Sequence, residues 1–255
     1  MRQRVFSGSL LVLAASAMAF SATSNTCSSE VFSAAVVDSV KDQFEGFVAA
    51  PEISKRMALT SSSNLLQANS KMWEIAIDKT SQTVSEGAEL SSSEMVAQNS
   101  GESGSLCFVV RRPVLCREHG MTLSVLAAEY PQFLDGFRMF GVVKETAVDD
   151  EGLANFQQNH FQFPLYRDES LSFYKAFGKR NLTVFGLLKL FTNFSMMRRM
   201  SKKAIEGNMV GEGIVQGGII VFGKDGTPRA MYAEETGNDL PIKDIVMALA
   251  AVRNE

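Results

Sequence analysis

From residue 106 onward the chain alternates apolar runs with amphipathic segments, and this alternation limits the possible folds more than any other feature. Continuous apolar runs predict buried strands, because a strand covered on both faces needs apolar side chains on both, and such runs lie at 106–111 and 137–143. Apolar residues three or four apart predict helices at 116–133, 150–160, 169–177 and 241–253. A short strand at 163–166 and a hairpin of 219–222 with 230–233 complete the pattern. The sequence therefore predicts an α/β fold with a mixed central sheet flanked by helices.

The chain before residue 106 is less regular. Residues 31–48 have the spacing of an amphipathic helix, and 73–77 are typical of a short strand. Two stretches rich in Ser, Asn or Gly, 60–70 and 91–105, predict loops. We therefore expect a helical extension in front of the α/β domain.

The first nineteen residues have the pattern of a signal peptide: a basic start, an apolar stretch and the small residues Ala17 and Ala19 before the expected cut. A membrane anchor or a buried helix is the alternative. The junction after Ala19 begins with Phe20 and hydroxyl-rich residues, and it resembles the bipartite presequence of complex algal plastids. We therefore expect import into a complex plastid, with secretion or residence in the endomembrane lumen as the alternative.

These patterns divide the chain into three parts. Residues 1–19 are predicted to be the signal peptide, 20–71 a transit-like and helical N-terminal extension, and 72–255 the α/β domain. Within this domain, 180–203 is rich in Leu, Phe and Met and is expected to be an inserted helical segment. It either covers the sheet as a core helix or forms a lid, an apolar substrate groove or a membrane-surface contact.

Composition excludes several classes of function. A formal net charge of -3 gives no basic surface for nucleic acid. The three cysteines are too irregularly spaced for a disulfide framework or for zinc, and no glycine-rich phosphate loop is present. We therefore expect no bound cofactor, no metal and no membrane span in the mature chain.

One cysteine has surroundings that favour a reactive thiol. Cys116 follows a predicted strand and begins a predicted helix, where unpaired backbone N–H groups and the helix dipole favour an anion. Arg111, Arg112 and Arg117 add positive charge, and His119 lies one turn along the same helix. The alternative is a buried, inert cysteine, so a redox role requires that this sulfur be reachable from solvent.

Several short motifs follow one another along the domain. In chain order they are Arg111-Arg112-Pro113, Leu115-Cys116-Arg117-Glu118, Val142-Val143-Lys144-Glu145, Asp168-Glu169-Ser170 with Phe173-Tyr174, Gly207-Asn208 with Gly211, and Gln216-Gly217-Gly218. With these motifs the chain resembles the peroxiredoxin-like 2 proteins, a family that includes AhpC/TSA antioxidant-enzyme-domain proteins, prostamide/prostaglandin F synthase and selenoprotein U. The resemblance implies a thioredoxin-like fold, redox chemistry on a peroxide or a disulfide, and a thioredoxin-type electron donor.

The chain departs from this family at its redox motif. Members usually read Arg-Arg-Pro-Gly-Cys-x-x-Cys, sometimes with selenocysteine, whereas here Pro113 leads directly to Val114, Leu115 and Cys116. Cys116 matches the second redox position, so an external thiol would have to resolve its sulfenic acid. Cys107 is expected to lie too far away to do so. Either the chain has one redox thiol, or its gene sequence omits a selenocysteine codon.

A second departure concerns the cis-proline that many thioredoxin-fold proteins place opposite the active cysteine. The chain has no proline between Pro164 and Pro228, and the resemblance implies that Gln216 and Gly217 take its place, with glycine allowing close backbone approach to the sulfur. Together with Pro113 they are the candidate substrate contacts. The alternative is a structural pair of β-bulge glycines.

Three functions remain open. In the first, Cys116 attacks a peroxide or a disulfide with Arg112 and Arg117 as electrostatic partners, and an external thiol such as thioredoxin or glutathione, linked indirectly to NADPH, restores it. In the second, the chain reduces lipid endoperoxides, with the segment 180–203 as the apolar pocket. In the third, it is a thioredoxin-fold module that binds partners without catalysis.

Overall fold

The computed structural model describes residues 32–48, 57–59, 69–78, 81, 83–111, 116–144, 150–178, 198, 216–235 and 238–255. The predicted signal and transit segments lie outside this part of the chain, and so does the inserted segment 180–203 apart from residue 198. Among the described helices, none is both long enough and apolar enough to cross a membrane.

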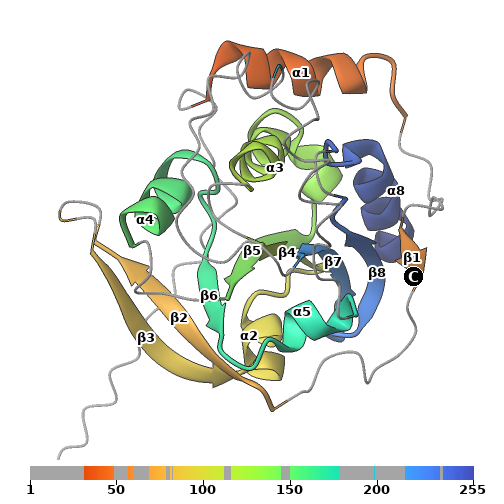
Figure 1. Cartoon of the computed structure of the whole chain (residues 1–255). Helices are drawn as coiled ribbons and strands as arrows, with labels where there is room; N and C mark the ends of the chain where they lie inside the picture. The colour runs from red at the N-terminus through yellow and green to blue at the C-terminus, as the bar shows by residue number, and fades with distance from the viewer. Residues whose placement is uncertain are drawn as a thin grey trace, which may run out of the picture.

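A single mixed sheet forms the centre of the described chain, with strand order β1-β8-β7-β4-β5-β6-β2-β3 (Figure 1). Its strands are β1 Ala58–Leu59, β2 Lys71–Ile77, β3 Val84–Ser91, β4 Gly104–Val110, β5 Phe137–Val143, β6 Leu165–Asp168, β7 Gly218–Gly223 and β8 Pro228–Ala233. β4, β5 and β6 are parallel, whereas β7 and β8 are antiparallel to their neighbours. The order β8-β7-β4-β5, with a helix between the parallel strands and one after the hairpin, confirms the predicted thioredoxin-like fold.

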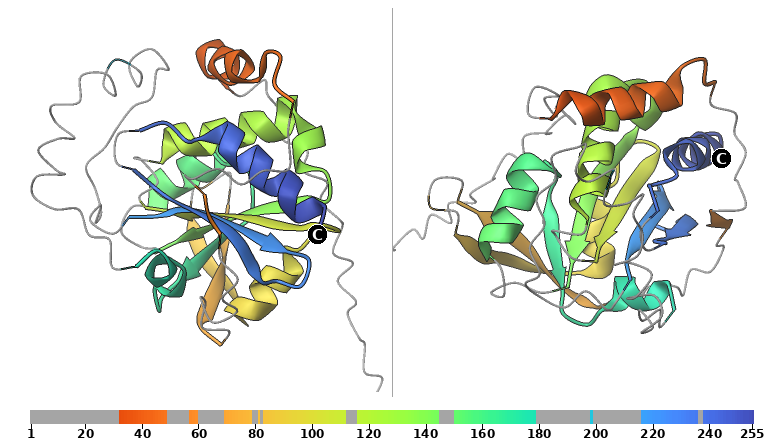
Figure 2. Two further views of the ribbon diagram at one scale, coloured as in Figure 1. Left: turned by 90° about the vertical axis from the view of Figure 1, so that its right-hand side faces the viewer. Right: turned by 45° about the horizontal axis from the view of Figure 1, so that its top comes forward.

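Helices cover both faces of this sheet. They are α1 Ala34–Phe44, α2 Ser92–Gln98, α3 Arg117–Glu129, α4 Asp150–Asn159, α5 Ser172–Ala176 and α8 Ile242–Arg253. α3, α4 and α8 lie on one face and α2 and α5 on the other, while α1 forms an outer layer over α3 (Figures 1 and 2). The predicted N-terminal helix is thus confirmed, and it packs on the domain.

β4 separates two apolar cores. Its side chains alternate between the two faces, because successive residues of a strand point to opposite sides. Leu106, Phe108 and Val110 belong to the core beneath α3 and α8, whereas Cys107 and Val109 belong to the core beneath α2 and α5. Burial on both sides explains why this strand reads as a continuous apolar run.

Before β4, one sequence prediction is wrong and one strand was not predicted. The stretch 91–105, expected to be a loop, contains α2, which begins with a capping box in which Ser91 Oγ accepts the Glu94 N–H and Glu94 Oε2 accepts the Ser91 N–H. The strand β3 was not expected, because most of its side chains are exposed and polar.

Two helices are shorter than the sequence predicts. α3 stops at Glu129 because Pro131 cannot continue a helix and disfavours helical backbone at Tyr130, which has φ -133°. α5 begins only at Ser172, since Leu171 adopts a left-handed conformation with φ 56°. The buried carboxylate of Asp168 then accepts the N–H of Phe173 at 2.8 Å and fixes this late start.

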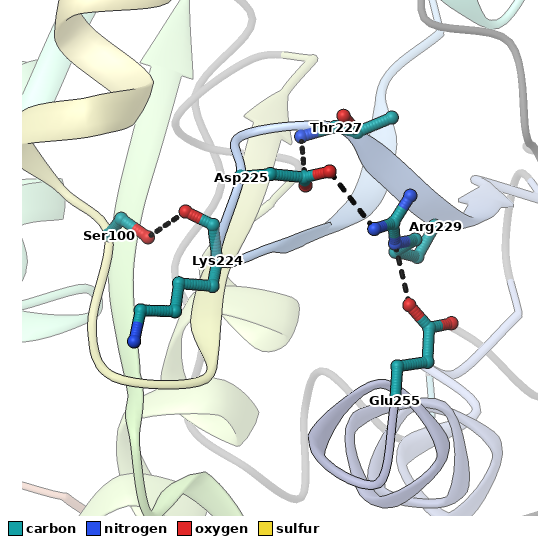
Figure 3. A network of polar contacts seen from close by, with 6 residues as sticks. All are labelled: Ser100, Lys224, Asp225, Thr227, Arg229 and Glu255. Atoms are coloured by element: carbon teal, nitrogen blue, oxygen red, sulfur yellow. Dashed lines mark hydrogen bonds and ion pairs between the residues drawn. The ribbon is translucent and has the colours of Figure 1, made fainter.

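A polar network fastens the turn between β7 and β8 to the C-terminus (Figure 3). Asp225 accepts the Thr227 N–H at 2.9 Å and forms an ion pair with Arg229, whose Nε lies 2.7 Å from Glu255 Oε2. Because Gly223 pairs with Gly104 at the start of β4, this network lies at the opposite end of the sheet from the start of α3.

Candidate redox site

Cys116 lies where the sequence places it, at the amino end of the helix that follows β4. It is the N-cap residue of α3, and its carbonyl oxygen accepts the Gly120 N–H at 2.8 Å. The first turn of a helix leaves backbone N–H groups without helical partners, and the helix dipole is positive there. A helix N-cap favours the thiolate form of a cysteine, although the Cys116 side chain makes no capping hydrogen bond to the first turn of α3 here.

The same residue has no exposed surface in this structure. Cys116 is 0% exposed and belongs to the core beneath α3 and α8, so the expectation of a sulfur that solvent can reach is not met. The residues of α3 from Glu118 to Ala127 are all buried as well. Access for a peroxide or for a second thiol therefore requires Cys116 to become exposed during the reaction.

Arg111, at the end of β4, forms a buried ion pair. Its Nη1 lies 3.6 Å from Oε1 of Glu234, the residue that follows β8, and the two side chains are only 2% and 8% exposed. The sequence predicts that Arg111 adds to the positive field at Cys116, but the pairing offsets part of that charge. Arg112 and Pro113, the other candidates before Cys116, lie outside the described residues.

Arg117 is half-buried, and its charge acts on His160, the residue that directly follows α4. Burial and, to a lesser degree, the positive charge of Arg117 lower the pKa of His160 to about 4. Nε2 of His160 lies 3.2 Å from Asn155 Oδ1. His160 is therefore neutral at pH 7.

His119 fastens the first turn of α3 to the chain after β8. Its ring is buried, with Nε2 3.2 Å from the carbonyl oxygen of Asn238 and its centroid 6.4 Å from the ring of Phe108 in β4. The amino end of α3 is thus held between β4 and the segment that begins with Glu234.

Gly217 allows a close backbone approach, but its partner is β4. A β-carbon at this position would overlap the carbonyl oxygen of Val109 and lie 3.2 Å from the Arg111 nitrogen. The Gly217 carbonyl accepts the Glu234 N–H at 3.0 Å. Gln216 is half-buried beside it, and the described residues contain no cis peptide bond. Gly217 therefore joins the ends of β4, β7 and β8.

Cys107 is unsuited to act as a second redox thiol. It is completely buried in the core beneath α2 and α5, and burial, followed by the charge of Asp168, raises its pKa well above the ordinary value. It lies on the face of the sheet opposite to α3. The described part of the chain also contains no cluster of His, Cys, Asp or Glu that could hold a metal ion.

Comparison with known proteins gives consistent matches. Residues 122–236 match the AhpC/TSA antioxidant enzyme family. Peroxiredoxin-like 2A of Xenopus tropicalis is 36% identical over 126 residues, which cover 48% of this chain and 52% of that protein. Peroxiredoxin-like 2A of Danio rerio is 33% identical over 157 residues, 59% of this chain and 70% of that protein. The chain belongs to the peroxiredoxin-like 2 family.

Further matches are more distant. Peroxiredoxin-like 2A of Homo sapiens is 28% identical over 159 residues, 60% of this chain and 65% of that protein. Among solved structures, AhpC of Mycobacterium tuberculosis aligns with a TM-score of 0.44 and 13% identity over 76% of this chain and 93% of that one. The chain spans about half the length of the two Xenopus relatives, 52% and 51%.

Two residues shape the site without having been predicted as site residues: Glu234 was missed, and Tyr174 was named only as part of a motif. Glu234 lies within the stretch that matches the AhpC/TSA family, and a charged residue directly after a buried strand is a signal that could have found it. Tyr174 of α5 is buried and its Oη donates to the Val110 carbonyl oxygen at 2.7 Å, at the end of β4. Cys116 itself precedes the matched stretch, which begins at residue 122.

Proposed function

We propose that this peroxiredoxin-like 2 protein is a thiol-dependent oxidoreductase in which Cys116 attacks a peroxide or a disulfide. The observation that supports this most directly is the position of Cys116 at the N-cap of α3. Backbone N–H groups of the first helical turn favour the thiolate, which is the nucleophilic form. Arg117, and Arg112 outside the described residues, are the candidate electrostatic partners, while Pro113, Gln216 and Gly217 are the candidate substrate contacts.

With a peroxide, the chemistry proceeds in three steps. The Cys116 thiolate attacks one peroxide oxygen, so that an S–O bond forms, the O–O bond breaks and the leaving oxygen takes a proton to become water or an alcohol. An external thiol then condenses with the sulfenic acid, releasing water and forming a mixed disulfide. A second external thiol attacks the external sulfur and returns Cys116 as a thiol. A thioredoxin-type protein or glutathione fits this role, and no bound cofactor is needed.

The complete burial of Cys116 favours a second candidate function. A thiol without exposed surface reacts slowly, because reagents reach it only after a local opening. In that case the chain would be a thioredoxin-fold module that binds a partner without catalysis. The two candidates differ in the rate at which Cys116 reacts.

The test is peroxide consumption by the full chain in the presence of thioredoxin or glutathione. We expect turnover that is lost in Cys116→Ser and retained in Cys107→Ser, the matched control in the opposite core. In parallel, the rate of Cys116 alkylation between pH 5 and 9 should show a midpoint below that of free cysteine. Absence of turnover together with a midpoint near 8.5 would support the non-catalytic module instead.

We also propose that the chain reaches a complex plastid after removal of residues 1–19. The support is the apolar stretch before Ala19 and the Phe20 that would follow the cut. Mass spectrometry of the mature N-terminus tests this, with Phe20 or a later residue expected in first position. A mature chain that begins before Phe20 would refute the cleavage.

A further inference from the structure

Three strand ends meet around the ion pair of Arg111 and Glu234. Arg111 directly follows β4, Glu234 directly follows β8, and Gly217 directly precedes β7. The Glu234 N–H donates to the Gly217 carbonyl at 3.0 Å, and the Glu234 carboxylate lies 3.6 Å from the Arg111 guanidinium. Glu234 is thus held by its backbone to one strand and by its side chain to another.

The junction of Arg111, Gly217 and Glu234 is connected to the start of α3 both along the chain and through a side-chain contact. Along the chain, Arg111 is five residues before Cys116. In space, the segment that begins with Glu234 leads to Asn238, whose carbonyl oxygen lies 3.2 Å from His119 Nε2 in the first turn of α3. Since the ion pair is almost completely buried, water screens its charges weakly, and their field extends further than that of an exposed pair.

Other charged groups also lie near this end of the molecule. From the described residues they are Arg117, Glu118 and His119 of α3, Lys144 after β5, Asp168 at the end of β6, Glu235 and Asp239 after β8, Asp150 at the start of α4 and His160 after its end. Glu235 is exposed, and His160 is neutral above its pKa of about 4. Glu118, His119 and Asp168 are buried as well, and the Asp168 carboxylate accepts from Ser172 Oγ and from the Phe173 N–H. Arg111 and Glu234 are paired with each other.

We propose that Glu234 is a positioning residue for Cys116: by offsetting the charge of the buried Arg111 guanidinium, it sets how strongly the amino end of α3 favours the thiolate. This inference rests on the proposed function of Cys116 for its biological meaning. Glu234 touches neither the sulfur nor a substrate. It acts through Arg111, which it holds at the end of β4.

A four-way charge cycle in the full chain tests the proposal, with the pH profile of Cys116 alkylation by iodoacetamide as the measurement. Glu234→Gln removes a negative charge beside Arg111 and should move the midpoint about one pH unit lower, a ~10-fold gain in rate well below the midpoint. Arg111→Gln should move it about as far in the opposite direction. The double variant, which has neither charge, should return to the wild-type midpoint.

Opposite shifts distinguish this role from a structural one, because loss of packing would move both single variants in the same direction. Arg229→Gln and Glu255→Gln are matched controls, since this Arg–Glu pair lies at the other end of the sheet (Figure 3) and should leave the midpoint unchanged. The proposal would be overturned if the alkylation midpoints of Glu234→Gln and Arg111→Gln equalled those of the control variants, or if both shifted in the same direction.

Two further variants cover the case in which a single charge change prevents folding. Glu234→Asp keeps the negative charge and should show an alkylation profile close to that of wild type. The uncharged double variant should fold and should also have the wild-type alkylation midpoint. An alkylation midpoint of the double variant that differs from the wild-type midpoint by about one pH unit would refute the proposal. Failure of the proposed function would look different, because peroxide turnover would then be absent from wild type while the alkylation midpoints still shifted in opposite directions.

Discussion

Cys107 and Cys116 lie on opposite sides of the central sheet, Cys107 in the core beneath α2 and α5 and Cys116 in the core beneath α3 and α8. Both are buried, and neither forms a disulfide in the structure. A disulfide requires Cα atoms within about 7 Å of each other and side chains that point together. The sheet itself therefore prevents these two thiols from pairing.

The products of oxidation should reflect this separation. The third cysteine of the chain, Cys27, is first replaced by serine so that it cannot act as the resolving thiol. In this Cys27→Ser variant, one equivalent of peroxide without added thiol should give sulfenic acid at Cys116, and added glutathione should convert it to a mixed disulfide. Mass spectrometry of peptides under non-reducing conditions measures both. A peptide pair that links residues 107 and 116 would contradict the separation.

Tyr174 should stabilise the end of β4. Tyr174→Phe removes the hydrogen bond from its Oη to the Val110 carbonyl, and we expect a loss of about 1–2 kcal/mol in the free energy of unfolding. Urea denaturation measures this loss, and hydrogen exchange at residues 109–111 should become faster. Tyr166→Phe is the control, because it removes a similar bond to Asn99 away from this strand end. Equal exchange at 109–111 in both variants would argue against the role of Tyr174.

Gly217 should tolerate no side chain. Gly217→Ala would place a β-carbon on the Val109 carbonyl oxygen, and the backbone can relieve that overlap only by moving β7 away from β4. We expect a loss of about 1–3 kcal/mol in the free energy of unfolding, measured by urea denaturation. Gly87→Ala, where the nearest atom lies at 3.4 Å, should change it by less than about 0.5 kcal/mol. Similar losses in both variants would refute the overlap.

His160 should make the protein less stable in acid. Its folded pKa of about 4 lies below the unfolded value of 6.5, so the unfolded chain binds a proton first and stability falls as the pH drops from 6.5 to 4. His160→Gln should reduce this fall by about 1–2 kcal/mol, since the ring is only partly buried. Unfolding at several pH values measures it, and NMR can follow the ring directly because the chain has two histidines. A ring that titrates near 6.5 would contradict the expectation.

The elements around β4 could be predicted because their signals are local. A strand buried on both faces is apolar throughout, and the helices on the sheet repeat apolar residues every three or four positions. β5 was predicted with its observed bounds, Phe137–Val143. β3 could not be found in this way, because an edge strand with exposed faces has no apolar pattern. α2 was not predicted because the serines at its start are typical of a loop, although Ser91 and Glu94 have the spacing of a capping box.

The site was predictable only in part, for a related reason. That Cys116 begins a helix follows from neighbouring residues. The partner of Arg111 does not, because Glu234 approaches through the pairing of β4 with β7 and of β7 with β8. The burial of Cys116 is also a property of tertiary packing, because its core includes residues from α1, α3 and α8 that are far apart in the sequence.

The closed environment of Cys116 has a consequence for its kinetics. If the sulfur meets a peroxide only in a briefly open form, then at high oxidant concentration every opening ends in reaction. The rate would then level off at the opening rate of the amino end of α3 and become the same for small and bulky oxidants. The plateau would measure a motion of the protein, whereas the initial slope would measure the chemistry of the thiolate.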